Sequence, residues 1–394
     1  MMKNKQIIRL LAIAGIAGNL LSGCTKHQGQ EAALSPEPDL SAPIEFSEVI
    51  SDTQSPDTKG LNPLNNVGDG IELQGFGVFS WWNPRGEAFD ELHNPVNIYQ
   101  NNNPVQEVDF TTTPRKWKCN PTAYWPLACN LSFFAYAPYL EHTQPYMVGD
   151  ETVQPELRFP SADFTQGMPR ATFTPDVSVA NQVDFCIAAP VFDCPPSDDA
   201  IHLAFKHALT MIRLYVKLTG TPMPNTKYRI TDAIISGVAG TNTFTYRDNA
   251  AVPFVWDEVT DSTPKDGEYH LTKERSELVS TAMNHDINVY TQFKDDYIFI
   301  NGVDQGRIYI LPQNLSASAQ LELGLSTYIG NSSEVSSIFP PFRMTLPSTP
   351  AWQPGKVIAY QVTLDVSSAT VTSVTAVIVD WADSYNSHID QIIY

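Results

Sequence analysis

The amino-acid sequence predicts an all-β protein. Stretches in which apolar and polar residues alternate recur along most of the chain, and a period of two is typical of strands that bury one face. The 394 residues include 30 prolines and 21 glycines, a content that favours many turns over long helices. Apolar residues make up 42% of the chain, which is enough to fill a core. Many short strands with turn-rich connections are typical of β-sandwiches.

The chain begins with a segment that has the plan of an export signal. Three cations in the first nine residues precede a short apolar run, which ends at Leu21-Ser22-Gly23-Cys24. The run is well below the roughly 20 residues that a helix needs to span a bilayer. Its last four residues resemble the lipobox of bacterial lipoproteins, which implies a signal peptide over residues 1–23 and acylation of Cys24, for example with palmitate. Residues 24–43 are polar and are predicted to form a disordered tether.

The first half of the mature chain contains five predicted strands. They cover Ile44–Ile50, Ile71–Phe79 with a glycine irregularity, Val105–Phe110, Leu131–Tyr136 and Val183–Ala188. The fourth strand lies within Thr122–Tyr139, the densest aromatic patch of the chain. Such a patch is able to bind sugars, but filling of the core is the commoner use and is the one predicted here.

The clearest β signal, Ile201–Leu218, changes phase in its middle. Ile201, Leu203 and Phe205 are apolar at odd positions, whereas from Ile212 onwards the apolar residues stand at even positions. Side chains alternate strictly along a strand, so one regular strand cannot bury both sets on one face. The reversal predicts a β-bulge or a crossing between sheets near residues 207–210.

Strands are predicted for most of the remaining chain. They cover Tyr228–Ser236, Thr243–Tyr246, Ile287–Gln292, Tyr297–Ile300, Arg307–Leu311, Leu321–Ile329, Lys356–Leu364 and Val371–Trp381. Residues Lys273–Met283 instead have the apolar spacing of one short helix. No repeat of fixed period indicates a solenoid or a propeller.

The charge of the chain excludes one class of partner. The formal net charge is −19, and removal of the three cations of the signal brings the mature chain near −22. This charge repels phosphate backbones, and the sequence has no basic stripe with interleaved aromatic residues. Nucleic acid is therefore not expected as a partner.

Four cysteines remain besides Cys24, in a compartment that permits disulfides. The pairs closest in sequence are Cys119 with Cys129 and Cys186 with Cys194, and each would close a loop of about ten residues, worth roughly 2–3 kcal/mol. Four cysteines allow three connectivities, and buried free thiols are the other interpretation. A zinc site is not predicted, because no spacing resembles C-x2-C and no histidine flanks these positions suitably.

No constellation of catalytic residues has a recognised spacing. The nucleophile elbow, the H-E-x-x-H motif, the phosphate loop and the dinucleotide fingerprint are all missing from the sequence. His202 and His207 are five residues apart, so they would point to opposite faces of a regular strand and could not share a metal ion. The adjacent pairs Asp198-Asp199 and Asp295-Asp296 are predicted to be exposed loop acids. The sequence therefore predicts no enzyme, no cofactor and no metal site.

Several segments resemble the fimbrillin-like proteins, which are lipoprotein precursors of pilus subunits in Gram-negative anaerobes. The matching segments are Leu131–Tyr139, Val183–Ala188, Ile201–Leu218, Ile310–Gln313, Trp352–Lys356 and Val379–Trp381. The resemblance implies two transthyretin-like β-sandwich domains in tandem, over residues 44–198 and 199–394. It also implies polymerisation by strand exchange after a protease trims the first strand in the following loop. Lys59 stands in that loop where the family usually has arginine, so an uncut anchor is an alternative.

These observations lead to a structural or adhesive subunit of a fimbria on the cell surface. Its expected partners are other pilus subunits, a host or bacterial surface ligand and, through acylated Cys24, the lipid of the outer membrane. The tail Asp383–Tyr394 is a candidate donor strand because it carries three isoleucines that the domain does not obviously need, and a frayed terminus is the alternative. The alternative function is a lipid-anchored surface protein that does not polymerise and binds glycan or another ligand, with Trp81, Trp82 or Trp125 as the candidate residues for a saccharide.

Overall fold

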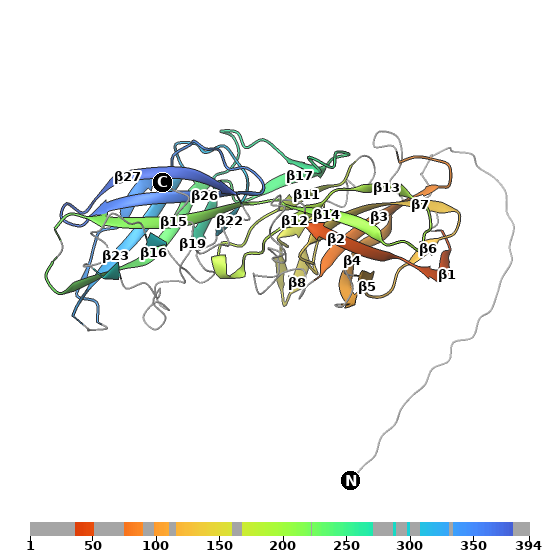
Figure 1. Ribbon diagram of the computed structural model, residues 1–394, viewed down its shortest axis with the longest axis horizontal. Coiled ribbons are helices and arrows are strands. Elements are labelled where there is room, and N and C mark those ends of the chain that lie inside the picture. The colour runs from red at the N-terminus through yellow and green to blue at the C-terminus, as the bar shows by residue number, and fades with distance from the viewer. Residues whose placement is uncertain are drawn as a thin grey trace, which may run out of the picture. The chain divides into compact units, whose positions relative to one another are not determined.

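A computed structural model describes residues 36–50, 75–89, 98–109, 116–159, 168–221, 223–270, 287–288, 298–299, 308–330 and 334–380. Within these ranges the protein consists of strands with one short 3-10 helix, η3 (Val179–Asn181), and contains no α-helix, so the prediction of an all-β fold is confirmed (Figure 1). No helix of the described ranges is long and apolar enough to cross a membrane. Cys24, Lys59, the predicted helix and the tail after residue 380 lie outside them.

An eight-stranded sheet gathers strands from the first half of the chain. In spatial order they are β12 (Cys186–Ala188), β14 (Ile201–His207), β2 (Glu45–Ile50), β5 (Lys116–Cys119), β4 (Ile98–Asp109), β3 (Phe76–Pro84), β7 (Cys129–Ala137) and β13 (Val191–Cys194). β12 also pairs with β7, so the order from β12 to β7 closes into a ring. Each of the seven strands of the ring contributes buried side chains to one apolar cluster, which we call the ring core.

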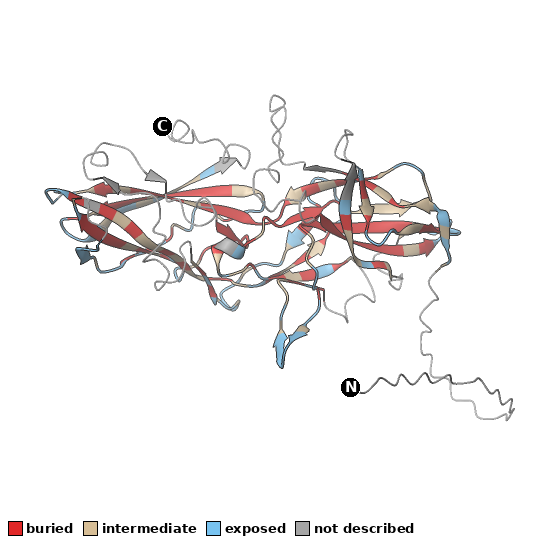
Figure 2. Ribbon diagram, turned by 90° about the horizontal axis from the view of Figure 1, so that it is seen from below, coloured by how far each residue is buried: buried red, intermediate tan, exposed pale blue. Residues whose placement is uncertain are grey.

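Two further sheets form a sandwich around a second core. One contains β15 (Thr210–Thr219), β21 (Ile298–Phe299), β22 (Ile308–Ile310), β26 (Lys356–Asp365) and β27 (Thr370–Asp380). The other contains β16 (Thr226–Val238), β19 (Gly267–His270), β20 (Ile287–Asn288), β23 (Gln320–Ile329), β24 (Ser337–Ile338) and β25 (Phe342–Thr345). Alternate residues of β15 and β26 pack with those of β16 and β23 in one buried cluster, the sandwich core. Buried residues follow the strands, as Figure 2 shows.

The remaining strands form three smaller sheets. These are β10 (Leu157–Arg158), β11 (Arg170–Phe173), β17 (Asn242–Tyr246) and β18 (Phe254–Trp256) in one sheet, the pair β1 (Pro38–Pro43) and β6 (Tyr124–Pro126), and the pair β8 (Tyr146–Val148) and β9 (Glu151–Val153). A third buried cluster combines Phe79 and Tyr136 of the eight-stranded sheet with Phe244 of β17 and Val357 of β26. This cluster joins the small sheet to both larger assemblies.

The predicted crossing between sheets lies at Ala208-Leu209. β14 ends at His207 in the eight-stranded sheet, and β15 begins at Thr210 in the sandwich. The two linking residues are fully buried. The change of sheet explains the reversed phase, because the odd residues of β14 face the ring core and the even residues of β15 face the sandwich core.

The predicted domain boundary near residue 198 stays a prediction. β14 follows this position in the chain but pairs with β2, which precedes it. β17 likewise pairs with β11. β14 also pairs with β12, so pairing among the described strands crosses residue 198 in three places.

Candidate functional site

One strand near the N-terminus lies inside the eight-stranded sheet. β2 pairs in parallel with β14, from Phe46 opposite Ile201 to Ile50 opposite Phe205. On its other side β2 pairs antiparallel with β5, at Glu45 and Phe46. The backbone of β2 thus has a partner on each side. Its removal would leave one unpaired edge on β14 and one on β5, and such edges are sites of association.

Apolar side chains anchor this strand in the ring core. Ile44 and Phe46 are 0% exposed. The Phe46 ring meets one ring of β3 and one of β7 edge to face, with centroids 5.9 and 5.6 Å apart. The Glu45 carboxylate, between these two apolar residues, faces away from the ring core and lies 2.7 Å from Lys118 Nζ. The alternation Ile44-Glu45-Phe46 is therefore the local reason that β2 buries one face.

The segment before β2 is held less firmly. β1 pairs with β6 at Pro38 opposite Pro126 and at Pro43 opposite Tyr124, with a shift of register between them. Proline has no amide hydrogen to donate to a strand ladder. Leu40 in this strand is 72% exposed. The N-terminal segment therefore changes from an exposed edge to a buried strand between β1 and β2.

Three polar side chains lie together beside the ring core. Asp184 and Cys186 are two residues apart, and Cys186 stands opposite His207 across the β12–β14 pair. His207 Nδ1 lies 2.9 Å from Asp184 Oδ1 and 3.5 Å from Cys186 Sγ. All three residues are buried, and one ligand atom from each lies within 4.8 Å of the others. A set of nitrogen, oxygen and sulfur donors is suited to a transition metal.

Sequence reasoning missed this cluster because His207 is 21 residues from Cys186 in the chain. His202 and His207 do lie on opposite faces of β14, since the first is exposed and the second is buried. The sequence does contain one indication of the cluster, the spacing of Asp184 and Cys186. Residues two apart lie on the same side of an extended chain, so this spacing brings a carboxylate and a thiol together. The strand pairing that adds the histidine is not visible in this pattern.

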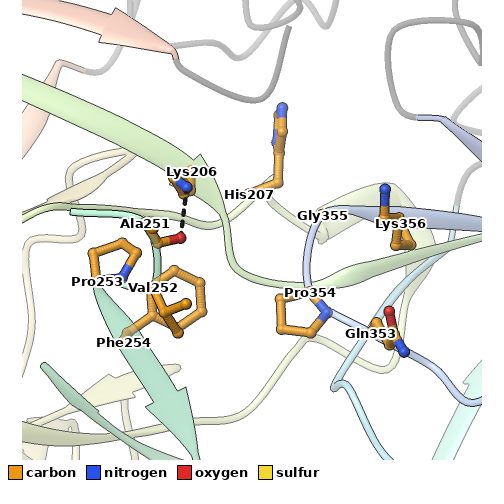
Figure 3. Close-up of a pocket in the computed structure, with 10 residues that line it drawn as sticks. All are labelled: Lys206, His207, Ala251, Val252, Pro253, Phe254, Gln353, Pro354, Gly355 and Lys356. Carbon is orange, nitrogen blue, oxygen red and sulfur yellow. Dashed lines mark hydrogen bonds between the residues drawn. The ribbon is translucent and has the colours of Figure 1, made fainter. Parts of the chain in front are cut away.

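A pocket of about 330 Å³ lies next to the crossing between β14 and β15 (Figure 3). Its walls come from residues 206–207, 251–254 and 353–356. Lys206 Nζ donates a hydrogen bond to the carbonyl oxygen of Ala251 at 2.8 Å. The ring of His207 points away from Phe254 and Pro354. His207 therefore borders the pocket, while its ring belongs to the cluster with Asp184 and Cys186.

Three of the four cysteines predicted as disulfide partners, Cys119, Cys129 and Cys194, are free thiols in the structure, and the disulfide pairing stays a prediction. Cys119 Sγ accepts a hydrogen bond from Gln100 Nε2 at 3.1 Å, and burial raises the pKa of this thiol to about 12. Burial also raises the pKa of Cys194 to about 11. A raised pKa keeps a thiol protonated, so neither side chain is an activated nucleophile.

The aromatic patch fills the core, as the sequence predicts. Phe133, Phe134 and Tyr136 are all 0% exposed. Of the tryptophans considered for glycan binding, Trp81 is 2% and Trp125 is 1% exposed. Neither of these two rings presents a face to a sugar in this structure.

Comparison with known proteins identifies the family. A family model described as fimbrillin-like matches residues 68–381. The chain therefore belongs to the fimbrillin-like family.

A solved structure shares its fold. A fimbrial protein from Bacteroides vulgatus is similar with a TM-score of 0.56 and 16% identity, over 86% of this chain and 99% of that one. Candidate cell adhesion proteins from Bacteroides uniformis and Bacteroides ovatus have TM-scores of 0.43 and 0.41, with 16% and 14% identity. They cover 87% and 88% of this chain and 99% of each of their own. No curated protein matches at a significant level.

Proposed function

We propose that this protein is a structural or adhesive subunit of a cell-surface pilus and that it polymerises by strand exchange. The observation that carries the proposal is the position of β2, a strand near the N-terminus with partners on both sides and its apolar side chains buried. Membership of the fimbrillin-like family supports the pilus. The similarity to a fimbrial protein supports it at the level of the fold. The proposed role requires no catalytic activity and no cofactor.

In this proposal the acceptor is the slot that β2 occupies. A cut at Lys59 would separate β1 and β2 from the rest of the chain. The slot would then expose core side chains that Ile44 and Phe46 cover, and full burial of each such side chain contributes about 1.5–3 kcal/mol. It would also expose the unpaired edges of β14 and β5. A strand from a second subunit with apolar residues at alternate positions would cover the exposed core side chains and pair with both strand edges.

We also propose that the precursor is a lipoprotein of the outer membrane. The sequence Leu21-Ser22-Gly23-Cys24 provides the acylation site, and several acyl chains hold a protein far more firmly than one. Residues 24–37 would then connect the lipid to the folded part, since the last six residues of the predicted tether form β1 and pair with β6. The partners in this proposal are the membrane lipid, other pilus subunits and a surface ligand.

The test combines electron microscopy of surface fibres with mass spectrometry of the N-terminus of their subunits. Fibres that disappear when the gene is deleted, with subunits that begin after Lys59, are the expected result. Fibres whose subunits still begin at Cys24 would assign the role of an uncut anchor. A monomeric surface protein in cells without fibres would contradict polymerisation.

A further inference from the structure

We propose that Asp184, Cys186 and His207 bind one zinc ion. These residues supply a carboxylate, a thiolate and an imidazole, which are the three kinds of side chain that Zn²⁺ uses in proteins. They come from β14, from the first residue of β12 and from the segment just before β12. The strand exchange proposed above does not use them. The proposal therefore stands or falls independently of assembly.

The distances between the donor atoms fit one small ion. A tetrahedral zinc with ordinary bond lengths separates a nitrogen from an oxygen ligand by about 3.3 Å and from a sulfur ligand by about 3.6 Å. The corresponding distances are 2.9 Å between His207 Nδ1 and Asp184 Oδ1 and 3.5 Å between His207 Nδ1 and Cys186 Sγ. The imidazole nitrogen is common to both contacts. All three donor atoms lie within 4.8 Å of one another.

The burial of these groups favours a cation. The side chain of His207 is 0% and that of Asp184 is 4% exposed. Among the described residues, Asp184 Oδ2 has no hydrogen-bond partner, and a buried carboxylate oxygen without a partner is costly. Zinc with one thiolate, one carboxylate and one neutral imidazole has a net charge of zero. The ion thus removes the cost of burying the two negative groups.

Three protein ligands leave the fourth tetrahedral position to solvent. His207 also borders the pocket of about 330 Å³ beside the crossing between β14 and β15. Bound zinc links β12 to β14, and it holds β14 on the side opposite β2.

The test measures zinc in the full-length protein, purified in detergent where it fractionates with membranes. Titration calorimetry with Zn²⁺ should give one site per chain. Loss of a residue that only orients a ligand typically costs 10- to 100-fold in affinity, so Cys186→Ala and His207→Gln should each weaken binding by about 100-fold or more. Cys119→Ala is the matched control, because it removes another buried thiol whose side-chain partner is Gln100. This variant should bind zinc like the unaltered protein.

A spectroscopic measurement covers the case in which a variant fails to fold. Cobalt(II) bound to the unaltered protein should give a tetrahedral spectrum with a thiolate-to-cobalt charge-transfer band. The band should be absent with Cys186→Ala and present with Cys119→Ala. No stoichiometric zinc, a cobalt spectrum without sulfur, equal affinity in all three variants, or Cys186 found in a disulfide would each overturn the proposal.

Discussion

Replacement of Phe46 by alanine measures how firmly β2 is held in the precursor. The Phe46 side chain is fully buried and meets two aromatic rings of the ring core. Truncation of a buried phenylalanine to alanine costs about 3–5 kcal/mol, since transfer free energy is lost and a cavity remains. Part of this cost is the loss of the two edge-to-face pairs, each worth about 0.5–1.5 kcal/mol beyond its area. We therefore expect the free energy of unfolding to fall by about 4 kcal/mol.

The assay is urea unfolding of the full-length precursor, followed by tryptophan fluorescence. Trp117 and Trp125 lie in the same core as Phe46 and report on its opening. Leu40→Ala is the control, because this β1 side chain is 72% exposed and its loss should change the free energy of unfolding by less than about 0.5 kcal/mol. A loss below about 1 kcal/mol for Phe46→Ala would refute the burial of β2 as an inner strand.

The same variant distinguishes the precursor from the assembled subunit. If β2 leaves before assembly, residue 46 is absent from the fibre. Fibres grown from Phe46→Ala precursor should then resist urea as well as those from the unaltered precursor. A fibre that is weakened by the substitution would show that β2 stays in place, as in an uncut subunit.

Four further predictions follow from the proposals and from one half-buried carboxyl group. Cys24→Ala should abolish fatty-acid labelling and membrane fractionation, and unchanged labelling would refute acylation at this residue. Lys59→Ala should leave the N-terminus untrimmed by mass spectrometry, whereas a trimmed variant places the cut elsewhere. Deletion of residues 388–394 should give a folded subunit that no longer polymerises, and fibres of normal length would exclude the tail as donor. Burial and then the nearby Asp176 raise the pKa of Glu156 from 4.5 to about 7. The folded protein therefore keeps a proton that the unfolded chain releases, and stability falls as the pH rises between about 4.5 and 7. Glu156→Gln should remove this part of the pH dependence of the urea midpoint, and an unaltered profile would contradict it.

The alternation of residues predicted those features that depend on the local backbone. The reversed phase between Ile201 and Leu218 located the crossing between sheets, because the side that each residue faces is set by its own strand. The aromatic strand Leu131–Tyr136 was predicted as core because filling of the core is the commoner use of an aromatic patch. It is part of β7, with every residue from Leu131 onwards buried.

The alternation of apolar and polar residues does not predict which distant strands pair. Ser47 Oγ lies 3.2 Å from His202 Nδ1 although the residues are 155 apart in the chain. Alternation says which side of a strand is buried, but any strand with a matching apolar face could be the partner. For the same reason the contact between Cys186 and His207 was not predicted. The candidate metal site was therefore invisible, while both strands that build it were predicted.

The topology of the ring explains how a trimmed subunit could keep its acceptor slot. β14 pairs with β2 on one side and with β12 on the other, and β12 continues the sheet by its second pairing with β7. When β2 leaves, the remaining strands stay connected in one sheet from β14 through β12, β7, β3 and β4 to β5. The slot therefore opens between β14 and β5, at the two ends of this sheet. In the proposed strand exchange, a strand that enters the slot would close the ring again, and the energy of re-closure would then drive addition of the next subunit.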